Sequence, residues 1–317
     1  MRSAVSCANG REFGGQNERD GRSTNSAEVR QENRCVPLNC PRMKTAICNE
    51  TFEGWEWGRT CEHVAELGYQ GIEVAPFTLS SDVREISAQR RAEIAATARA
   101  SALEVVGLHW LLVSPKGLSL TSDDEQVRAE TSDYLAALAD FCSDIGGKTL
   151  VLGSPAQRRL PAPEAVAVAE DRLLNCLDQV VGRAEKHGLT LCLEPLPPPE
   201  ADFILNLRQA VDLVKRIGHP SVRTIFDVKS ASSEDTPLPD LIRQFAPWIA
   251  HVHANDSNRR GPGSGDTDFV PILAALREAG YDRYVSIEVF DYTPDATTIA
   301  RDGLAYLRRC EARAAGS

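Results

Sequence analysis

Four residues whose side chains commonly bind metal ions recur at regular intervals in the second half of the sequence. They are Glu194, Asp227, His253 and Glu288, and they are separated by 33, 26 and 35 residues. Each lies in or directly after a short, mostly apolar run, such as 189–193 or 284–287. Because each interval is close to the length of one β/α unit, a closed parallel barrel would bring all four side chains to the same end.

Three carboxylates and one imidazole form an oxygen-rich ligand set, which suits Mn²⁺, Mg²⁺ or Co²⁺ better than a closed tetrahedral zinc site. A single strand-end carboxylate is usually a helix cap, and a single histidine in a barrel is usually structural. A structural role does not explain four such residues at consecutive strand ends, because burying carboxylates without a cation costs several kcal/mol. We therefore predict one bound divalent metal ion, with Mn²⁺ as first choice, at Glu194, Asp227, His253 and Glu288.

The segments that carry these residues alternate short β-type runs with amphipathic helical stretches, which is typical of a parallel sheet with crossover helices. No G-x-G-x-x-G follows the first run, as it often does in a doubly wound sheet. Eight β/α units in about 270 residues predict an α/β fold, a single-domain (β/α)₈ TIM barrel. The eight predicted strands span residues 44–49, 70–75, 103–111, 148–153, 189–194, 222–227, 249–254 and 284–289.

Residues 1–42 differ in composition from the rest of the chain. They are rich in Arg, Asn, Gly, Ser and Glu and show no sustained apolar period, so they bury too little to offset the entropy of ordering. We predict a disordered leader over 1–42, the barrel over 43–312 and a tail over 313–317. Met43 directly precedes the first predicted strand, which makes it an alternative start of translation.

The overall composition excludes several classes of protein. Of the 317 residues, 42% are hydrophobic and 25% are charged, which excludes collagen-like and wholly disordered chains. A net charge of −10 is unlike that of a general nucleic-acid-binding protein. No apolar run is long enough to span a membrane, and the N-terminus has no signal-peptide pattern. We expect a small-molecule partner, with no nucleic acid and no membrane.

The nine cysteines include no C-x-x-C pair, so neither a disulfide framework nor a zinc ribbon is indicated. We interpret them as reduced thiols and expect a cytoplasmic protein. The sequence does not determine the oligomeric state, and a homo-oligomer is one alternative.

Three further residues have side chains that suit a substrate site. Arg259 lies six residues after His253 in a loop with several glycines, and its guanidinium would stabilise a negative oxygen over the metal. His109 and Trp110 end the third predicted strand, where they offer either a hydrogen bond and a wall for a sugar or simple packing beneath the loops. Trp55 and Trp57 leave the same two alternatives open.

The segment from Met43 to Cys310 resembles the xylose-isomerase-like TIM barrels, the sugar phosphate isomerases/epimerases, and most nearly the ketose 3-epimerases of the D-tagatose and D-psicose type. The motifs that carry the resemblance are Leu193-Glu194-Pro195, Phe226-Asp227, His251-Val252-His253, Asn258-Arg259-Arg260 and Ile287-Glu288. In that family the four metal ligands are also Glu, Asp, His and Glu.

The resemblance implies further roles. It makes Glu194 and Glu288 the catalytic acid/base pair on opposite faces of the reacting carbon. It places Glu200 on a substrate hydroxyl and Arg259 on the oxygen that becomes negative.

One position departs from the family pattern. The ketose 3-epimerases have a substrate-contacting histidine three residues after the aspartate ligand, and this sequence has Ser230 there. Either Ser230 or the neighbouring Lys229 contacts the substrate in its place, or the substrate differs at that end.

The combined pattern predicts an isomerase: a divalent-metal-dependent sugar isomerase or epimerase that acts on a ketose or keto-sugar by proton transfer through a cis-enediolate. A metal-dependent dehydratase or lyase on a keto-inositol or oxidised sugar would use the same metal and base but expel a hydroxyl group. A non-catalytic sugar-binding barrel is a further alternative.

Overall fold

The chain folds into a closed barrel of eight parallel strands, which confirms the predicted fold. The structure is a computed structural model that describes residues 43–163 and 165–316. Consecutive strands pair in parallel, and β8 closes the barrel onto β1. The strands are β1 (Lys44–Cys48), β2 (Gly71–Val74), β3 (Glu104–Leu108), β4 (Thr149–Leu152), β5 (Thr190–Leu193), β6 (Val222–Asp227), β7 (Ile249–Ala254) and β8 (Tyr284–Ile287).

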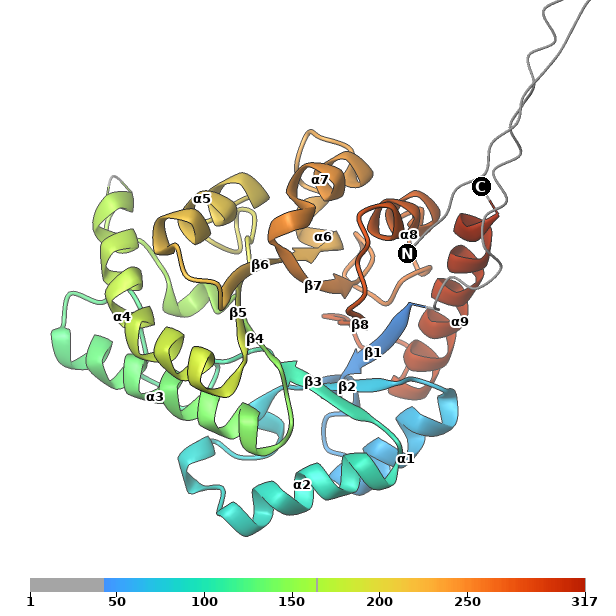
Figure 1. Ribbon diagram of the computed structural model, residues 1–317, viewed down its shortest axis with the longest axis horizontal. Helices are drawn as coiled ribbons and strands as arrows, with labels where there is room; N and C mark the ends of the chain where they lie inside the picture. Colours follow the sequence, from blue (N-terminus) through green and yellow to red (C-terminus); the bar gives the residue numbers. More distant parts are fainter. Residues whose placement is uncertain (1–42, 164, 317) are drawn as a thin grey trace, which may run out of the picture. The chain divides into compact units, whose positions relative to one another are not determined.

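Helices surround the strands, and neighbours such as α3 and α4 lie side by side (Figure 1). The short 3₁₀ turns η1 (Asn49–Phe52) and η4 (Pro155–Gln157) follow β1 and β4 at the carboxyl end of the barrel. The helices are α1 (Trp57–Leu67), α2 (Ala88–Ala100), α3 (Glu125–Asp144), α4 (Val166–His187), α5 (Leu207–Ile217), α6 (Val228–Ala231), α7 (Leu238–Phe245), α8 (Phe269–Glu278) and α9 (Ala296–Ala315).

Helix α4 illustrates how the apolar period positions a helix on the barrel. Leu173, Leu177, Val180 and Ala184 recur at intervals of three or four residues and are all buried in the main hydrophobic core. The helix ends at Gly188, which adopts a left-handed conformation at φ 63° and donates its N–H to the last turn. The chain is thereby directed into β5, which ends one residue before Glu194.

The predicted strands agree with the observed ones to within two residues, except for the third. A strand was expected over 103–111, but β3 ends at Leu108. The reason is that Trp110 adopts a left-handed backbone at φ 52°, which no extended strand accommodates. This turn directs His109 and Trp110 toward the centre of the carboxyl end, as described below.

The chain ends in helix α9. It runs to Ala315, and Ala314 is buried, so ordered helix extends past residue 312, where we placed the barrel boundary. The leader that we expect over 1–42 lies outside the described residues.

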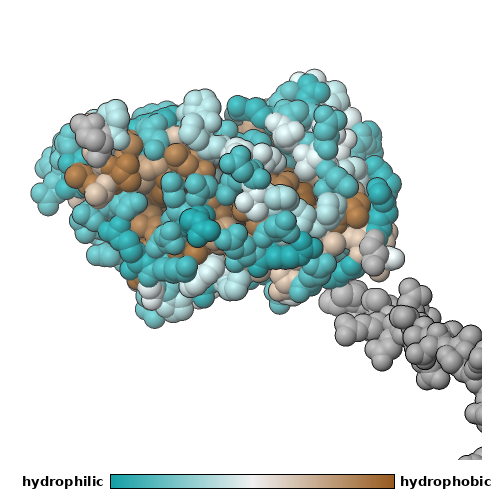
Figure 2. Space-filling model, turned by 90° about the horizontal axis from the view of Figure 1, so that it is seen from above, coloured by the Kyte–Doolittle hydropathy of each residue, from teal (hydrophilic) through white to brown (hydrophobic). Residues whose placement is uncertain are grey.

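One face of the molecule illustrates how its surface is composed. Figure 2 shows a largely hydrophilic face on which hydrophobic side chains appear only between polar ones. Among the described residues, no helix is long and apolar enough to cross a membrane. The six cysteines of the described region are all free and buried.

The close approach of the β3 and β4 backbones can be tested by a substitution. Gly107 pairs with Thr149, and a Cβ at Gly107 would lie 2.1 Å from the Thr149 carbonyl oxygen. Because backbone cannot easily move away, Gly107→Ala should lower the free energy of unfolding by roughly 3 kcal/mol, measured by urea denaturation.

Gly182→Ala is the matched control. A Cβ at Gly182, within α4, meets nothing within 4 Å, so this variant should be more stable by about 0.5–1 kcal/mol. Equal stability of the two variants would contradict the close approach of β3 and β4.

Candidate metal site and adjoining cavity

The barrel brings the four predicted ligand residues together. Glu194 follows β5, Asp227 ends β6, His253 lies in β7 and Glu288 follows β8. One ligand atom from each lies within 4.8 Å of the others, and all four side chains are buried. The parallel strands thus achieve the convergence that the spacing indicated.

The geometry between His253 and Glu288 tests whether these residues fit a metal ion. Nδ1 of His253 lies at ion-pair distance, 3.0 Å, from Oε2 of Glu288, and neither of these buried atoms has an aligned hydrogen bond with the described residues. Two cis ligands of one ion, each about 2.1 Å from it, are about 3 Å apart. The pair is therefore spaced as ligands are and not aligned as a hydrogen bond, so the residues fit a divalent cation.

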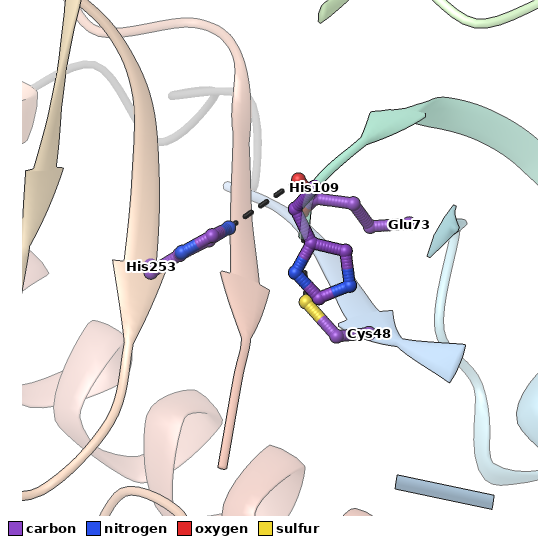
Figure 3. Close-up of side chains that lie close together, drawn as sticks. All are labelled: Cys48, Glu73, His109 and His253. Atoms are coloured by element: carbon purple, nitrogen blue, oxygen red, sulfur yellow. Dashed lines mark hydrogen bonds and ion pairs between the residues drawn. The ribbon is translucent and has the colours of Figure 1, made fainter. Parts of the chain in front are cut away.

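Glu73 from β2 fixes the orientation of His253. Nε2 of His253 lies 3.3 Å from Oε1 of Glu73, the contact drawn as a dashed line in Figure 3. A hydrogen donated from Nε2 leaves the lone pair of Nδ1 facing the ligand set, which is how carboxylates orient metal-binding histidines. Glu73 also lies 2.8 Å from Nε2 of His251 and accepts from the Cys48 thiol.

The sequence did not identify Glu73 as part of the candidate site. Burial raises its pKa, but His251 and His253 outweigh this effect and hold the pKa well below its usual range. A charged residue in the apolar 70–75 segment was the signal that could have identified it.

Without a cation, the buried carboxylates of the four ligand residues repel one another. Burial, followed by repulsion from Glu288 and Asp227, raises the pKa of Glu194 to about 8. Burial also raises the pKa of Glu288, but His253 and His109 outweigh it and hold the pKa below its usual range. A bound cation would relieve the repulsion among these carboxylates.

Glu194 reaches the cluster because residue 153 has no side chain. A Cβ at Gly153, directly after β4, would lie 2.0 Å from Oε2 of Glu194. The glycine therefore leaves the space that the carboxylate occupies.

Asp227 is held by two neutral donors. Its Oδ1 accepts from the backbone N–H of Ser230 at 2.6 Å, and its Oδ2 accepts from Nδ2 of Asn255 at 2.6 Å. Asn255 also accepts from the backbone N–H of Lys229 at 2.8 Å, which ties β6 to the segment after β7. Sequence analysis missed Asn255, although it lies two residues from His253.

A cavity of about 340 Å³ lies against Glu194 and Glu288. This volume is within the range of small-molecule sites. Other residues that line it include His109, Trp110, Lys116, Gln157, Glu200, Arg259 and Phe290.

Ser230 is not among the residues that line this cavity, and its contact with a substrate stays a prediction. Its side chain is buried, and its backbone supports Asp227 instead. Nζ of Lys229 donates to both oxygens of Glu200, at 2.8 and 2.9 Å. Glu200 is therefore at the cavity wall with its carboxylate already positioned by a buried cation.

His109 and Trp110 both contact Glu288. Oε1 of Glu288 accepts from the indole Nε1 of Trp110 at 3.1 Å and lies 3.2 Å from Nδ1 of His109. Trp110 is 36% exposed and lines the cavity, whereas His109 is buried. Both residues line the cavity, so their positions fit the first alternative better than simple packing; their contact with a substrate stays a prediction.

Trp55 and Trp57 lie away from the cavity. Trp57 is buried at the start of α1 and donates to the Ile94 carbonyl, and Trp55 packs against Phe52 and beneath the Arg59 guanidinium. The packing alternative therefore applies to both.

The loop after β7 places Arg259 over the cavity. Asp256 is fully buried and accepts from backbone N–H groups of Gly263, Gly265 and Thr267, which fixes the loop. Arg259 itself has a left-handed backbone at φ 70°. Its guanidinium lies 5.5 Å from the Phe290 ring centre and forms no hydrogen bond or ion pair with the described residues.

Arg158, at the end of η4, was also missed. It is 1% exposed, and its Nε and Nη2 have no hydrogen-bond partner among the described residues. Burial lowers its pKa to about 10, against an opposing effect of Glu194. A buried cation therefore lies near the carboxylate ligands behind the cavity wall.

Fold and site together define a class of protein. A family model described as xylose isomerase-like TIM barrel matches residues 61–310. The chain belongs to this family, and the resemblance noted in the sequence is confirmed.

Particular relatives share most of the chain. D-psicose 3-epimerase of Agrobacterium fabrum (strain C58) is 30% identical over 257 residues, which cover 78% of this chain and 85% of the relative. 3-dehydro-D-guloside 4-epimerase of Escherichia coli (strain K12) is 25% identical over 279 residues, which cover 84% of this chain and all of the relative.

A solved structure of D-psicose 3-epimerase in the presence of D-fructose matches with a TM-score of 0.74 at 24% identity. The match covers 85% of this chain and 99% of that one. The structural match independently supports the fold. The named relatives are epimerases, so the prediction of an isomerase is confirmed.

The space at Gly153 leads to a prediction about ion binding. Gly153→Ala should fold, because the clashing atom is the mobile end of Glu194, but the carboxylate must turn out of the cluster. We expect the affinity for Mn²⁺ to fall by about 10- to 100-fold in titration calorimetry. The Gly182→Ala protein is the control, and an unchanged affinity in Gly153→Ala would contradict this placement of Glu194.

The raised pKa of Glu194 predicts how pH affects the metal-free protein. A folded-state pKa of about 8, above the ordinary 4.5, means that the protonated form is stabilised by folding. This contribution is complete below about pH 4.5 and is lost as the pH rises through about 8. In the presence of a chelator, the free energy of unfolding should fall less between about pH 5 and 8 in Glu194→Gln than in the wild type. Equal slopes in urea denaturation would contradict the shift.

Proposed function

We propose that this protein is a divalent-metal-dependent epimerase of a ketose or keto-sugar. The observation that carries the proposal is the convergence of Glu194, Asp227, His253 and Glu288 against a cavity of sugar-compatible size. The relatives named D-psicose 3-epimerase and 3-dehydro-D-guloside 4-epimerase support the same reaction class. We assign the four residues as ligands of one ion, with Mn²⁺ as first choice.

The two glutamates are the proposed acid/base pair. Both line the cavity, and they come from β5 and β8, which lie on different parts of the barrel wall. When bound, the cation polarises the carbonyl and hydroxyl oxygens of the substrate and so acidifies the proton between them. One glutamate removes that proton, and the other returns a proton to the opposite face of the planar enediolate.

Contacts around Glu288 suit this role. His109 and Trp110 engage Oε1, which fixes the direction of the carboxylate and leaves Oε2 free of hydrogen bonds. A base held in one orientation requires little reorganisation as the proton moves.

Two residues are proposed to bind the substrate. The Arg259 guanidinium lines the cavity and has no charged partner among the described residues, so it is available to stabilise the oxygen that becomes negative. Glu200, held by Lys229, is available to accept a hydrogen bond from a sugar hydroxyl. The aromatic side chains of Trp110 and Phe290 complete the wall with apolar surface for the sugar carbons.

The test is to incubate the Mn²⁺-loaded protein with ketoses in deuterated water. An epimerase incorporates deuterium at the carbon whose configuration changes and releases no water from the sugar. An unsaturated or dehydrated product would show a dehydratase instead, and ligand binding without any exchange would show a sugar-binding barrel.

Glu288→Gln tests the acid/base assignment. We expect deuterium exchange and epimerisation to fall by at least about 10²-fold, because the amide cannot take the proton, while the protein remains folded. Glu53→Gln, the same change at an exposed residue, is the control and should exchange normally. Wild-type turnover in Glu288→Gln would remove Glu288 from the acid/base pair.

A further inference from the structure

Glu50 is a buried carboxylate to which the proposed reaction assigns no role. It lies in η1, directly after β1, and is 2% exposed. It is not among the residues that line the cavity, so an effect on the substrate would pass through a neighbouring side chain. Because a buried carboxylate is costly unless a positive group compensates it, its partner indicates what it does.

That partner is His109, which directly follows β3. Nε2 of His109 lies at ion-pair distance, 2.9 Å, from Oε2 of Glu50, and Nδ1 lies 3.2 Å from Oε1 of Glu288. The imidazole therefore lies between two buried carboxylates. An imidazolium, with a hydrogen on each nitrogen, suits both contacts at once, whereas a neutral ring would present a lone pair to one of the two anions.

The surroundings of His109 differ from those of His253. Glu194 and Glu288 both approach Nδ1 of His253, at 4.0 and 3.0 Å. Among the described residues, a single carboxylate lies within ion-pair distance of each ring nitrogen of His109. The His109 ring therefore supplies the compensating charge for Glu50 itself.

The backbone on both sides of this contact is fixed. The side chain of Asn49, next to Glu50, accepts from the N–H of Ala75 at 2.7 Å, which ties η1 to the end of β2. The N–H of His109 donates to the Val74 carbonyl at 3.1 Å. Both side chains extend from fixed positions, so the contact between them can set the direction of the next carboxylate.

We propose that Glu50 is a positioning residue for Glu288 and acts through His109. The inference rests on the proposed function, because Glu288 is both a proposed ligand and half of the proposed acid/base pair. The ion pair with Glu50 holds the His109 ring, and the ring directs Oε1 of Glu288. Trp110 donates to the same Oε1, which leaves Oε2 facing His253 and the ligand cluster.

The experiment is a double-mutant cycle on Mn²⁺ affinity, measured by titration calorimetry on the full-length protein. Glu50→Gln and His109→Asn should each weaken binding by about 10-fold, as changes next to metal ligands commonly do. Because both act through one contact, the double variant should bind no more weakly than the weaker single variant. Glu50→Gln combined with Asn255→Ala, which acts through Asp227, should instead multiply the two losses.

Glu53→Gln, at an exposed residue of the same segment, is the matched control and should bind Mn²⁺ as the wild type does. Glu50→Asp keeps the charge but retracts it from His109, so it should recover part of the loss. If circular dichroism shows that Glu50→Gln does not fold, Glu50→Asp takes its place in the cycle with the same expected pattern.

Deuterium exchange provides a second readout, which a merely structural defect would not produce. At saturating Mn²⁺, with a pair of ketose epimers that the wild type interconverts, the proton of one epimer faces Glu288 and that of the other faces Glu194. Glu50→Gln should slow exchange by about 10- to 100-fold for the first epimer, with little change in KM. Exchange of the other epimer should stay near the wild-type rate, and equal slowing of both would contradict the inference.

The outcomes separate this inference from the proposed function. Wild-type Mn²⁺ affinity in Glu50→Gln, or multiplied losses when it is combined with His109→Asn, would overturn the positioning role and leave the proposed function intact. A wild-type protein that binds no Mn²⁺ would overturn both.

Discussion

Repulsion among buried carboxylates is the constraint on which the site depends. Glu194, Asp227 and Glu288 share one small volume at the carboxyl end of the barrel, where all three side chains are largely buried. The protein holds them there through the parallel strands, whose own hydrogen bonds cannot adjust to relieve the charge. Folding therefore holds the carboxylates close together at a cost in free energy, and a bound cation would offset this cost.

The groups around the ligands determine which atoms remain available. Glu73 faces one ring nitrogen of His253, and His109 and Trp110 engage one oxygen of Glu288. In both residues the opposite atom is buried and has no hydrogen-bond partner in the part of the chain that the structure describes. The contacts therefore direct the lone pairs inward and limit the side chains to one arrangement.

Two guanidinium groups lie near this negative centre. Arg259 extends over the cavity on a loop that the buried Asp256 fixes, and Arg158 is buried near Glu194. Carboxylates at the base and guanidinium groups around them suit a neutral, oxygen-rich substrate that becomes negatively charged as it reacts. Such an arrangement is consistent with the proposed proton transfer through an enediolate.

The sequence by itself determined the barrel and the four convergent residues. Regular spacing was sufficient for both, because parallel β/α units repeat at nearly constant length and present their strand ends on one face. Sequence also indicated Arg259, Glu200, His109 and Trp110, all of which line the cavity. Ser230 is not among the lining residues, because three residues after Asp227 the chain has already turned into α6 and the backbone N–H faces the aspartate; its contact with a substrate stays a prediction.

Only the tertiary structure revealed Glu50, Glu73, Asn255 and Arg158. Each is a single polar residue in an ordinary local context, and no periodic pattern distinguishes a buried carboxylate in strand β2 from a solvated one. Their significance comes from contacts between segments up to 180 residues apart, such as that of Glu73 with His253. Spacing along the chain determines which strand ends meet, whereas closure of the barrel decides which of the other polar side chains face them.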